Sequence, residues 1–375
     1  MKHAKLSASS SARWLFCPGS VKASEPFENT SSAAASEGTC AHELAEICLT
    51  NDASPYDYIG KTLHDAPDVQ VDKEMARYVE EYVNYVNSFS GDKFIEERVD
   101  FSPWVPEGFG TSDAIVIDQD NRTMHVIDLK YGKGVEVSAD SNTQGLLYAL
   151  GSLNDFGFMY DIDDIVIHIY QPRMGNISEW GISVPDLMDW AQGTVAPTAV
   201  LCMTDNAPKA AGEKQCQWCP AKATCETLQK HVEETIGADF DNLELPSVED
   251  GINFQNIMDN KKLIEGFLKA VEGHIFQKLS DGEDIPGYKL VVGRSVRAWS
   301  DKDEAEALLR KKRYKVGEIF KQTLISPTQA EKLMSKKYED VEHLVIKPEG
   351  KPTLAKASDK RPALKVNVTD EFDEL

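Results

Sequence analysis

The chain has 375 residues, with 40 Lys and Arg residues against 62 Asp and Glu residues, so its formal net charge is −22. Hydrophobic residues make up 41% of the chain and charged residues 27%, which excludes a mostly disordered or collagen-like protein. No run of about 18 apolar residues occurs, and residues 1–11 lack the apolar stretch of a signal peptide, so we expect a cytoplasmic protein without a membrane partner.

The first part of the chain is predicted to be helical. A Ser-rich turn at residues 7–19 ends at a Pro-Gly pair, and apolar residues recur at helical spacing over residues 36–50 and 71–89. The apolar period then changes to that of strands. The predicted strands cover residues 93–101, 110–118, 123–130, 164–171 and 177–184, and further helices cover residues 141–154 and 185–203. This order predicts an α/β fold in which a mixed sheet is flanked by helices.

We assign residues 1–236 to this α/β domain. Residues 237–346 are expected to form an α+β C-terminal appendage, and residues 347–375, which are rich in proline and charge, a mobile tail. Within the appendage we expect a long amphipathic helix, a hairpin, a second helix and a basic patch, which could contact a DNA backbone but which we favour as solvating a helix end. These lie at residues 254–279, 288–299, 302–313 and 310–315, respectively.

The acidity of the chain counts against a nucleic-acid partner, because phosphate binding relies on clusters of Lys and Arg. Net charge is a property of the whole surface, however. Screening over about 8 to 10 Å allows a locally basic groove or a metal site to work on an acidic protein. DNA therefore remains a possible partner, provided that its binding site is locally basic or holds a cation.

The seven cysteines are an odd number in a chain without an export signal, so a disulfide framework is not expected. Cys216, Cys219 and Cys225 have the spacing C-x2-C-x5-C, which brings three thiolates to one centre. Cys17, isolated beside its own Pro-Gly pair, is the best candidate for a fourth ligand. Four thiolates suit either a 4Fe-4S cluster or a structural Zn²⁺. The other cysteines are expected to be buried, free side chains: Cys40, Cys48 and Cys202.

Two tryptophans flank these proposed ligands. Trp14 and Trp218 could stack on bases, but packing against the metal centre is the interpretation that we favour.

A second group of polar residues falls on the predicted sheet. Asp128 and Lys130 lie two residues apart on one strand and so share a face, and Asp113 begins an apolar run on the preceding strand. If the two strands pair, both carboxylates converge. Paired carboxylates bind a hard divalent cation that can activate water and stabilise charge on a phosphoryl oxygen. Lys130 would orient the nucleophile or stabilise the charge of the transition state.

Helical residues around the sheet complete this group. Gln144 and Tyr148 lie four residues apart on the helix that follows, and Thr39, His42 and Glu46 share a face of an earlier helix. A single His is more often structural than functional, and an acid-x-Lys pattern is common by chance. Only their combination carries information.

That combination resembles a known family. Gly38-Thr39-x-x-His42, Gly110-x-x-Asp113, Asp128-x-Lys130, Gln144-x-x-x-Tyr148 and the early cysteine completed by C-x2-C-x5-C resemble the RecB-like branch of the PD-(D/E)XK nucleases over about residues 8–226. The pattern is most similar to the iron-sulfur members, such as the AddB nuclease domain and the CRISPR-associated adaptation nuclease. Stretches near both ends also resemble a phage- and prophage-associated family of unassigned function.

The resemblance implies a restriction-endonuclease-like core and a metal-dependent deoxyribonuclease that acts on DNA ends or single strands in phage or prophage DNA replication or recombination. Lys130 would be the catalytic lysine, and Gln144 and Tyr148 would position the phosphate. Mg²⁺ or Mn²⁺ would be held by His42, Asp113, Asp128 and the carbonyl of Leu129. The 4Fe-4S cluster would be held by Cys17, Cys216, Cys219 and Cys225.

An alternative function comes from another class. The same fold could serve as a non-catalytic DNA-processing scaffold or as a binding partner of a recombinase, a single-strand-binding protein or a polymerase. The set of two aspartates and a lysine argues against this alternative. The sequence has no P-loop motif, so a motor would have to be a separate chain.

Overall fold

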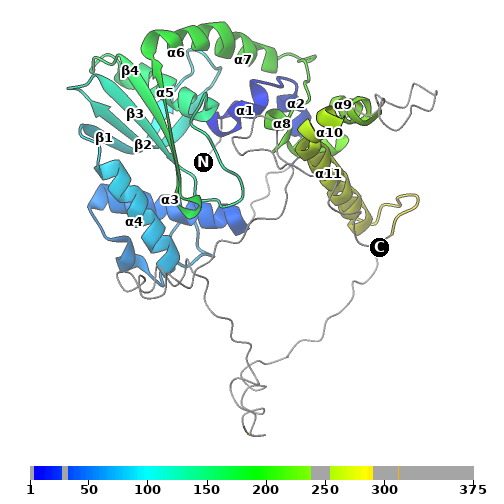
Figure 1. The fold of residues 1–375 in the computed structure, drawn as a ribbon, viewed down its shortest axis with the longest axis horizontal. Coiled ribbons are helices and arrows are strands. Elements are labelled where there is room, and N and C mark those ends of the chain that lie inside the picture. Colours follow the sequence, from blue (N-terminus) through cyan, green and yellow to red (C-terminus); the bar gives the residue numbers. More distant parts are fainter. Residues whose placement is uncertain (1–3, 28–32, 238–253, 290–310, 312–375) are drawn as a thin grey trace, which may run out of the picture. The chain divides into compact units, whose positions relative to one another are not determined.

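The computed structural model describes residues 4–27, 33–237, 254–289 and 311. The described residues up to 289 belong to one compact unit, in which one five-stranded sheet carries helices on both faces (Figure 1). The strands are β1 (Asp92–Asp100), β2 (Phe109–Asp118), β3 (Thr123–Leu129), β4 (Asp164–Gln171) and β5 (Asn176–Ser183). The helices on the two faces of the sheet are α3 (Ala33–Asn51), α4 (Lys73–Asn87), α5 (Thr143–Phe156), α6 (Val184–Trp190) and α7 (Ala196–Cys202). The remaining helices are α1 (Ser11–Trp14), α2 (Ser20–Ser24), α8 (Glu213–Cys216), α9 (Glu226–Gly237), α10 (Phe254–Asp259) and α11 (Lys261–Ser280).

The sheet is mixed, as predicted. Its order is β1-β2-β3-β4-β5, and all neighbours are antiparallel except β3 and β4, which are parallel because α5 connects them as a crossover helix. The strand predicted at residues 164–171 coincides with β4, and the ends of the other four differ from the prediction by at most one residue. The predicted mixed α/β fold is therefore confirmed.

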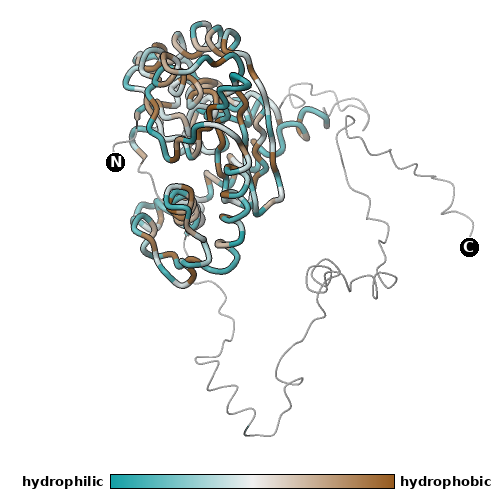
Figure 2. Tube along the Cα trace, turned by 90° about the vertical axis from the view of Figure 1, so that its left-hand side faces the viewer, coloured by the Kyte–Doolittle hydropathy of each residue, from teal (hydrophilic) through white to brown (hydrophobic). Residues whose placement is uncertain are grey.

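Alternation along each strand divides the core between the two faces of the sheet. On β3, Met124 and Val126 pack with α5 and α6, whereas Ile127 and Leu129 pack with α3 and α4. Hydrophobic and hydrophilic residues also alternate along the helices in Figure 2, as expected for helices with one buried face. Asp128 therefore lies on the α5 face, which is the face that carries the polar group described below.

Two predicted helices are interrupted, each for a local reason. The helix expected at residues 254–279 divides at Asn260, whose side-chain amide donates to the carbonyl of Asn256 at 2.9 Å and so competes with helical hydrogen bonding. The helix expected at residues 185–203 passes through a π-helical turn at Ala191–Val195. Pro197, in the first turn of α7, lacks the amide that a regular helix would need there.

Some predictions fall outside the described residues. The hairpin at 288–299, the helix at 302–313 and the basic patch at 310–315 lie almost wholly outside them, and the tail at 347–375 lies entirely outside. The domain boundary at residue 236 stays a prediction. Among the described residues, no helix has the length and apolar character needed to span a bilayer.

A histidine pair, one member of which is buried, lies on the α4 face of the sheet. His168 on β4 is only 1% exposed, and its Nε2 lies 2.9 Å from Nδ1 of His125 on β3. Its Nδ1 lies 2.9 Å from the hydroxyl of Tyr85, which in turn donates to a carboxylate oxygen of Glu179 at 2.7 Å. Because the Tyr85 proton goes to Glu179, the chain is satisfied when each imidazole carries one proton. Both histidines are then neutral in the folded protein.

This pair predicts a loss of stability in acid. Burial and the neighbouring His125 lower the pKa of His168 from 6.5 to about 4, so the unfolded chain takes up this proton first. The stabilising effect is fully present above pH 6.5 and is lost as the pH falls from 6.5 to 4, by about 3 kcal/mol. Urea unfolding at several pH values, with His168→Gln beside the wild type, measures it. A variant that loses as much stability in acid as the wild type would contradict the prediction.

Candidate metal centre and cysteine group

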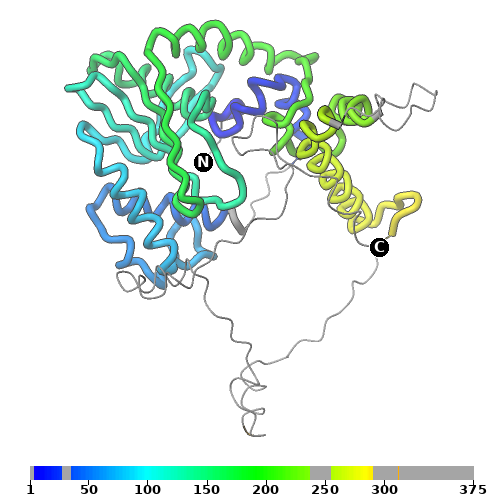
Figure 3. Tube along the Cα trace, viewed as in Figure 1, coloured from blue at the N-terminus to red at the C-terminus, as the bar shows by residue number. Residues whose placement is uncertain are grey.

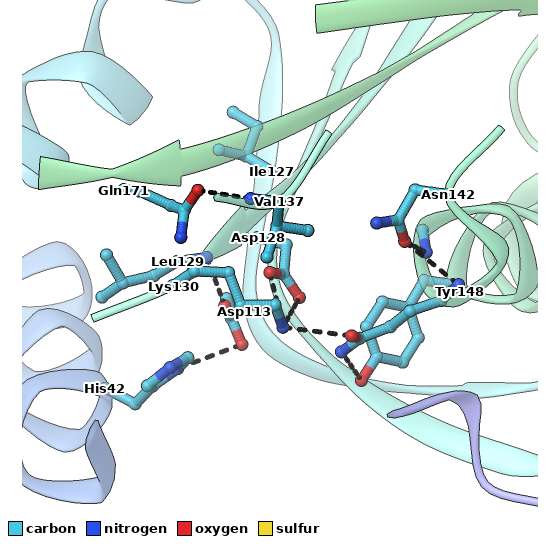
Figure 4. Close-up of polar contacts among 12 residues, drawn as sticks. His42, Asp113, Ile127, Asp128, Leu129, Lys130, Val137, Asn142, Tyr148 and Gln171 are labelled. Atoms are coloured by element: carbon cyan, nitrogen blue, oxygen red, sulfur yellow. Dashed lines mark hydrogen bonds and ion pairs between the residues drawn. The ribbon is translucent and has the colours of Figure 1, made fainter. Parts of the chain in front are cut away.

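The polar group on the α5 face begins where the pairing of β2 stops being regular. The β2–β3 ladder runs from Asp118 and Thr123 to Ala114 and Ile127 and ends there. One step further, the Asp113 carboxylate lies where the next ladder bond would form, and its Oδ2 accepts the amide proton of Leu129 at 2.7 Å. Asp113 is thus held by the backbone of the neighbouring strand (Figure 4).

Lys130 connects the sheet to α5. Its Nζ lies 2.7 Å and 3.0 Å from the two carboxylate oxygens of Asp128 and donates to Oε1 of Gln144 at 3.0 Å. Nε2 of Gln144 then donates to the hydroxyl of Tyr148 at 3.1 Å. The side chain of Asn142 caps α5 by accepting the amide protons of Gln144 and Gly145, each at 3.1 Å. The cap fixes the first turn of α5, from which Gln144 reaches Lys130.

The glycine of the Gly-x-x-Asp motif has a steric reason. A Cβ at Gly110 would lie 2.7 Å from the ring of Tyr148, closer than such atoms approach one another. Only glycine lets the ring of Tyr148 rest against β2. The motif therefore places Asp113 and Tyr148 in a fixed relation.

Two further polar residues lie on the other side of Asp113, one from α3 and one from β1. Nδ1 of His42 lies 3.2 Å from Oδ1 of Asp113, and the ligand-type atoms of His42, Glu96 and Asp113 all lie within 4.8 Å of one another. Glu96 faces Asp113 in the β1–β2 register, at the step where the regular pairing is interrupted. Its φ of 48° is in the left-handed region, which is unfavourable for a non-glycine residue and persists only where the surrounding structure holds it.

Glu96 was not among the predicted site residues. In the sequence it is one of several charged residues of a strand whose outer face could be solvated, so no local signal distinguishes it. Only the β1–β2 register, which places it opposite Asp113, could have identified it. The carbonyl of Leu129, expected as a metal ligand, stays a prediction, while the amide of Leu129 donates to Asp113.

The charges of this group balance one another. Burial opposes protonation of His42, but the adjacent Asp113 carboxylate outweighs it and raises the pKa of His42 to about 9. Burial also opposes the charge of Lys130, yet Asp128 and Asp113 raise its pKa above the ordinary value. The pKa of Glu96 is raised to about 8, mainly by burial and by Asp113. At neutral pH, the protons on these residues offset the negative charge of the two aspartates.

A groove leads to the group along α3. Thr39, His42 and Glu46, which were predicted to share a helical face, all line it. Glu43 also borders the groove, but both of its carboxylate oxygens accept backbone amide protons, from His64 at 2.7 Å and from Asp65 at 2.8 Å. Its role is therefore to hold the loop after α3.

The four cysteines of the predicted centre come from two distant parts of the chain. Cys17 follows α1, and its Sγ accepts the amide proton of Ala210 at 3.3 Å. Cys216 ends α8, and its carbonyl accepts the amide proton of Cys219 at 3.3 Å. Burial raises the pKa of the Cys216 thiol, and Cys219, Cys17 and Cys225 add to the increase, so these three cysteines lie within electrostatic range of Cys216.

Buried polar atoms without partners lie in the same N-terminal segment. Nε of Arg13 and Oγ of Ser20 are buried and have no hydrogen-bond partner among the described residues. Burial raises the pKa of the Cys219 thiol, and Arg13 opposes the increase, which places Arg13 within electrostatic range of this sulfur. Unsatisfied buried donors are costly in a packed protein, and an anionic metal–sulfur group would give them acceptors.

The other cysteines and the two tryptophans differ in their burial. Cys40, Cys48 and Cys202 are free and buried in the core, as predicted. Trp14 is fully buried, and its Nε1 donates to the carbonyl of Ser7 at 3.1 Å. Trp218 is 75% exposed, so the prediction that it packs against the cysteine group is wrong. It lies in the exposed turn between Cys216 and Cys219.

A family model matches residues 3–362 of the chain, and its description is "Protein of unknown function (DUF2800)". The matched span includes all residues of the polar group and all four cysteines. The description states no activity, substrate or cofactor. The function is therefore argued from the geometry of the two groups.

Proposed function

We propose that this chain, which belongs to the DUF2800 family, is a divalent-metal-dependent deoxyribonuclease with a RecB-like PD-(D/E)XK site. The observation that carries the proposal is the meeting of Asp113, Asp128 and Lys130 on two adjacent strands, with the Lys130 ammonium on the Asp128 carboxylate. Acyl, hydride or glycosyl transfer would leave this combination of two carboxylates, a histidine and a charged lysine without a clear role. Phosphodiester hydrolysis uses all four.

The residues around Asp113 suit Mg²⁺ or Mn²⁺. His42, Asp113 and Glu96 have ligand atoms within 4.8 Å of one another, and Asp128 lies on the adjacent strand. Carboxylate oxygens suit both cations, and the imidazole nitrogen is better suited to Mn²⁺ than to Mg²⁺. These residues would hold a cation whose chemistry would be to lower the pKa of water and to neutralise charge on the phosphate. His42, protonated by its pairing with Asp113, would have to release its proton to act as a ligand.

The other residues bind and orient the phosphate. The ammonium of Lys130 remains charged because its pKa is raised, so it can stabilise negative charge that develops on a phosphoryl oxygen. Gln144 accepts a hydrogen bond from Lys130 and limits where its Nζ can lie. The amide of Gln144 and the hydroxyl of Tyr148 would contact the same or the neighbouring phosphate. The RecB-like resemblance suggests DNA ends or single strands as substrate, in phage or prophage DNA replication or recombination.

The four cysteines would hold a 4Fe-4S cluster, with a structural Zn²⁺ as the alternative. The chemistry of the donor set fits either centre, since both are bound by four thiolates. The buried, unpartnered Nε of Arg13 and Oγ of Ser20 support an anionic group beside them. The centre would link the segment that contains α1 to the segment that contains α8. Iron, sulfide and zinc analysis of anaerobically purified protein distinguishes the two.

The test of the nuclease is hydrolysis of end-labelled single- and double-stranded DNA by anaerobically purified protein. We expect cleavage with Mn²⁺ or Mg²⁺ and none in excess EDTA, because the carboxylates alone cannot activate water. His42→Ala should lower both Mn²⁺ affinity and cleavage. His64→Ala, which removes an exposed histidine on the loop after α3, is the matched control. A wild type that leaves every substrate intact would instead support a non-catalytic DNA-processing scaffold.

A further inference from the structure

Exposed aromatic and basic side chains gather beside the cysteine group. Phe16, next to Cys17, is 47% exposed, and Trp218 is 75% exposed. Lys209 and Lys214 are exposed in the same part of the chain. We call these residues, Phe16, Lys209, Lys214 and Trp218, the aromatic–basic patch.

Backbone contacts bring the two segments of the patch together. The amide of Gly19 donates to the carbonyl of Pro208 at 2.8 Å, and the amide of Ala210 donates to Cys17 Sγ at 3.3 Å. The segment of α1 and α2 and the segment that leads into α8 therefore lie side by side, as Figure 3 shows. Nζ of Lys214 lies 5.7 Å from the centroid of the Phe16 ring.

Trp218 and Lys214 belong to one short segment. The amides of Cys216 and Gln217 donate to the carbonyls four residues earlier, so the chain is helical from Gly212 to Gln217. Trp218 follows this helical turn directly, in the exposed turn before Cys219. The segment therefore carries both an exposed ring and the ammonium that lies beside Phe16.

Two acidic residues near the patch are paired with lysines. Glu213 forms an ion pair with Lys262 at 3.5 Å, and Asp205 forms one with Lys22. Lys209 and Lys214 therefore give the patch a positive charge on a chain whose net charge is −22. This is the local basic surface that a polyanion needs on an acidic protein.

The patch is connected to the proposed nuclease site through α1. Oγ of Ser11 lies 2.7 Å from Oγ1 of Thr143, the residue before Gln144. From Ser11 the chain continues helically to Cys17, since the amides of Leu15 and Cys17 donate to the carbonyls four residues earlier. At 1.5 Å per residue, Phe16 lies about 8 Å along the helix from Ser11. This separation along the chain is short enough for one extended strand to span.

We propose that the aromatic–basic patch binds single-stranded DNA, with bases stacked on Trp218 and Phe16 and phosphates beside Lys209 and Lys214. The proposal rests on the proposed nuclease function, because the bound strand is the one that reaches the metal centre. Stacking needs a free base face, which single strands offer and duplexes do not. Because every base has such a face, the patch binds without sequence preference.

The test is the affinity of the full chain for fluorescein-labelled oligo(dT), measured by anisotropy in EDTA so that no cleavage occurs. Trp218→Ala should weaken binding by about 5- to 150-fold, and Trp218→Phe, which keeps a ring, should restore most of it. Phe158→Ala is the matched control, because Phe158 is 81% exposed but lies outside the patch. Lys214→Ala should reduce the slope of log affinity against log salt by about 0.7.

The outcomes separate this proposal from the nuclease itself. Equal affinities for Trp218→Ala and Phe158→Ala, with unchanged metal content and melting temperature, would overturn the patch even if the protein cleaves DNA. If Trp218→Ala lost as much affinity for duplex DNA as for single-stranded DNA, the proposed stacking of bases on Trp218 would be overturned. A protein that cleaves nothing but binds oligo(dT) through Trp218 would retain the patch and refute the nuclease. If Trp218→Ala loses the metal bound by the cysteines, the affinities of Lys214→Ala and Trp218→Phe for oligo(dT) test the patch instead.

Discussion

Replacing Lys130 by methionine is expected to lower the rate of DNA cleavage by about 100- to 1,000-fold while leaving Mn²⁺ binding intact or stronger. The reduction is that of losing one charged group placed against a developing negative charge. Lys130 now competes with any cation for Asp128, since its Nζ lies 2.7 Å and 3.0 Å from the two carboxylate oxygens. Methionine removes this competitor and keeps the length of the aliphatic chain.

The matched substitution is Asp128→Asn, which should lose cleavage and Mn²⁺ affinity together. Asp128 is 3% exposed, so water cannot take the place of its carboxylate when the charge is removed. Cleavage is measured on end-labelled DNA, and Mn²⁺ binding by calorimetry on each variant. Cleavage by Lys130→Met at the wild-type rate, or equal Mn²⁺ affinities in Asp128→Asn and wild type, would refute the assigned roles.

The second large effect is expected at the cysteines. Cys216→Ala should abolish bound iron and reduce the free energy of unfolding by about 5 kcal/mol, because the proposed centre would tie together parts of the chain roughly 200 residues apart. A cross-link of that span removes much of the freedom of the unfolded chain. Cys48→Ala is the control, since Cys48 is also buried but lies on α3 in the hydrophobic core and is not one of the four proposed ligands.

Iron content and urea unfolding under anaerobic conditions measure this effect. We expect about four iron atoms per chain in the wild type and in Cys48→Ala, and none in Cys216→Ala. Zinc at about one atom per chain, lost in the same variant, would identify the structural zinc site instead. Full stability of Cys216→Ala without metal would show that the centre does not hold the fold together.

The sheet could be predicted from the sequence because burial imposes a period of two on each strand. The strands at 164–171 and 177–184 illustrate this, since apolar residues bounded by turns fix them to within one residue of β4 and β5. The boundaries of the helices were less well defined. At Asn260, a single side chain with its own hydrogen bond to the backbone ends α10, and apolar spacing alone does not record it.

The site was only partly predictable for a related reason. Asp113, Asp128 and Lys130 follow from the strand period and from the order of the motifs, and the structure brings them together. Glu96 depends instead on the β1–β2 register and on a left-handed backbone, which are properties of the folded sheet. The exposure of Trp218 is likewise a property of the fold, since tryptophan beside metal ligands suggests burial as readily as binding.

The position of Asp113 between β2 and β3 has a practical consequence. Its carboxylate both pairs with His42 and accepts the amide proton of Leu129 in place of a strand-to-strand bond. A substitution there would disturb the seam of the sheet as well as the chemistry, and an inactive Asp113 variant would say little about the reaction. A substrate complex for crystallography or cryo-microscopy is therefore better trapped with Lys130→Met, which leaves that seam closed.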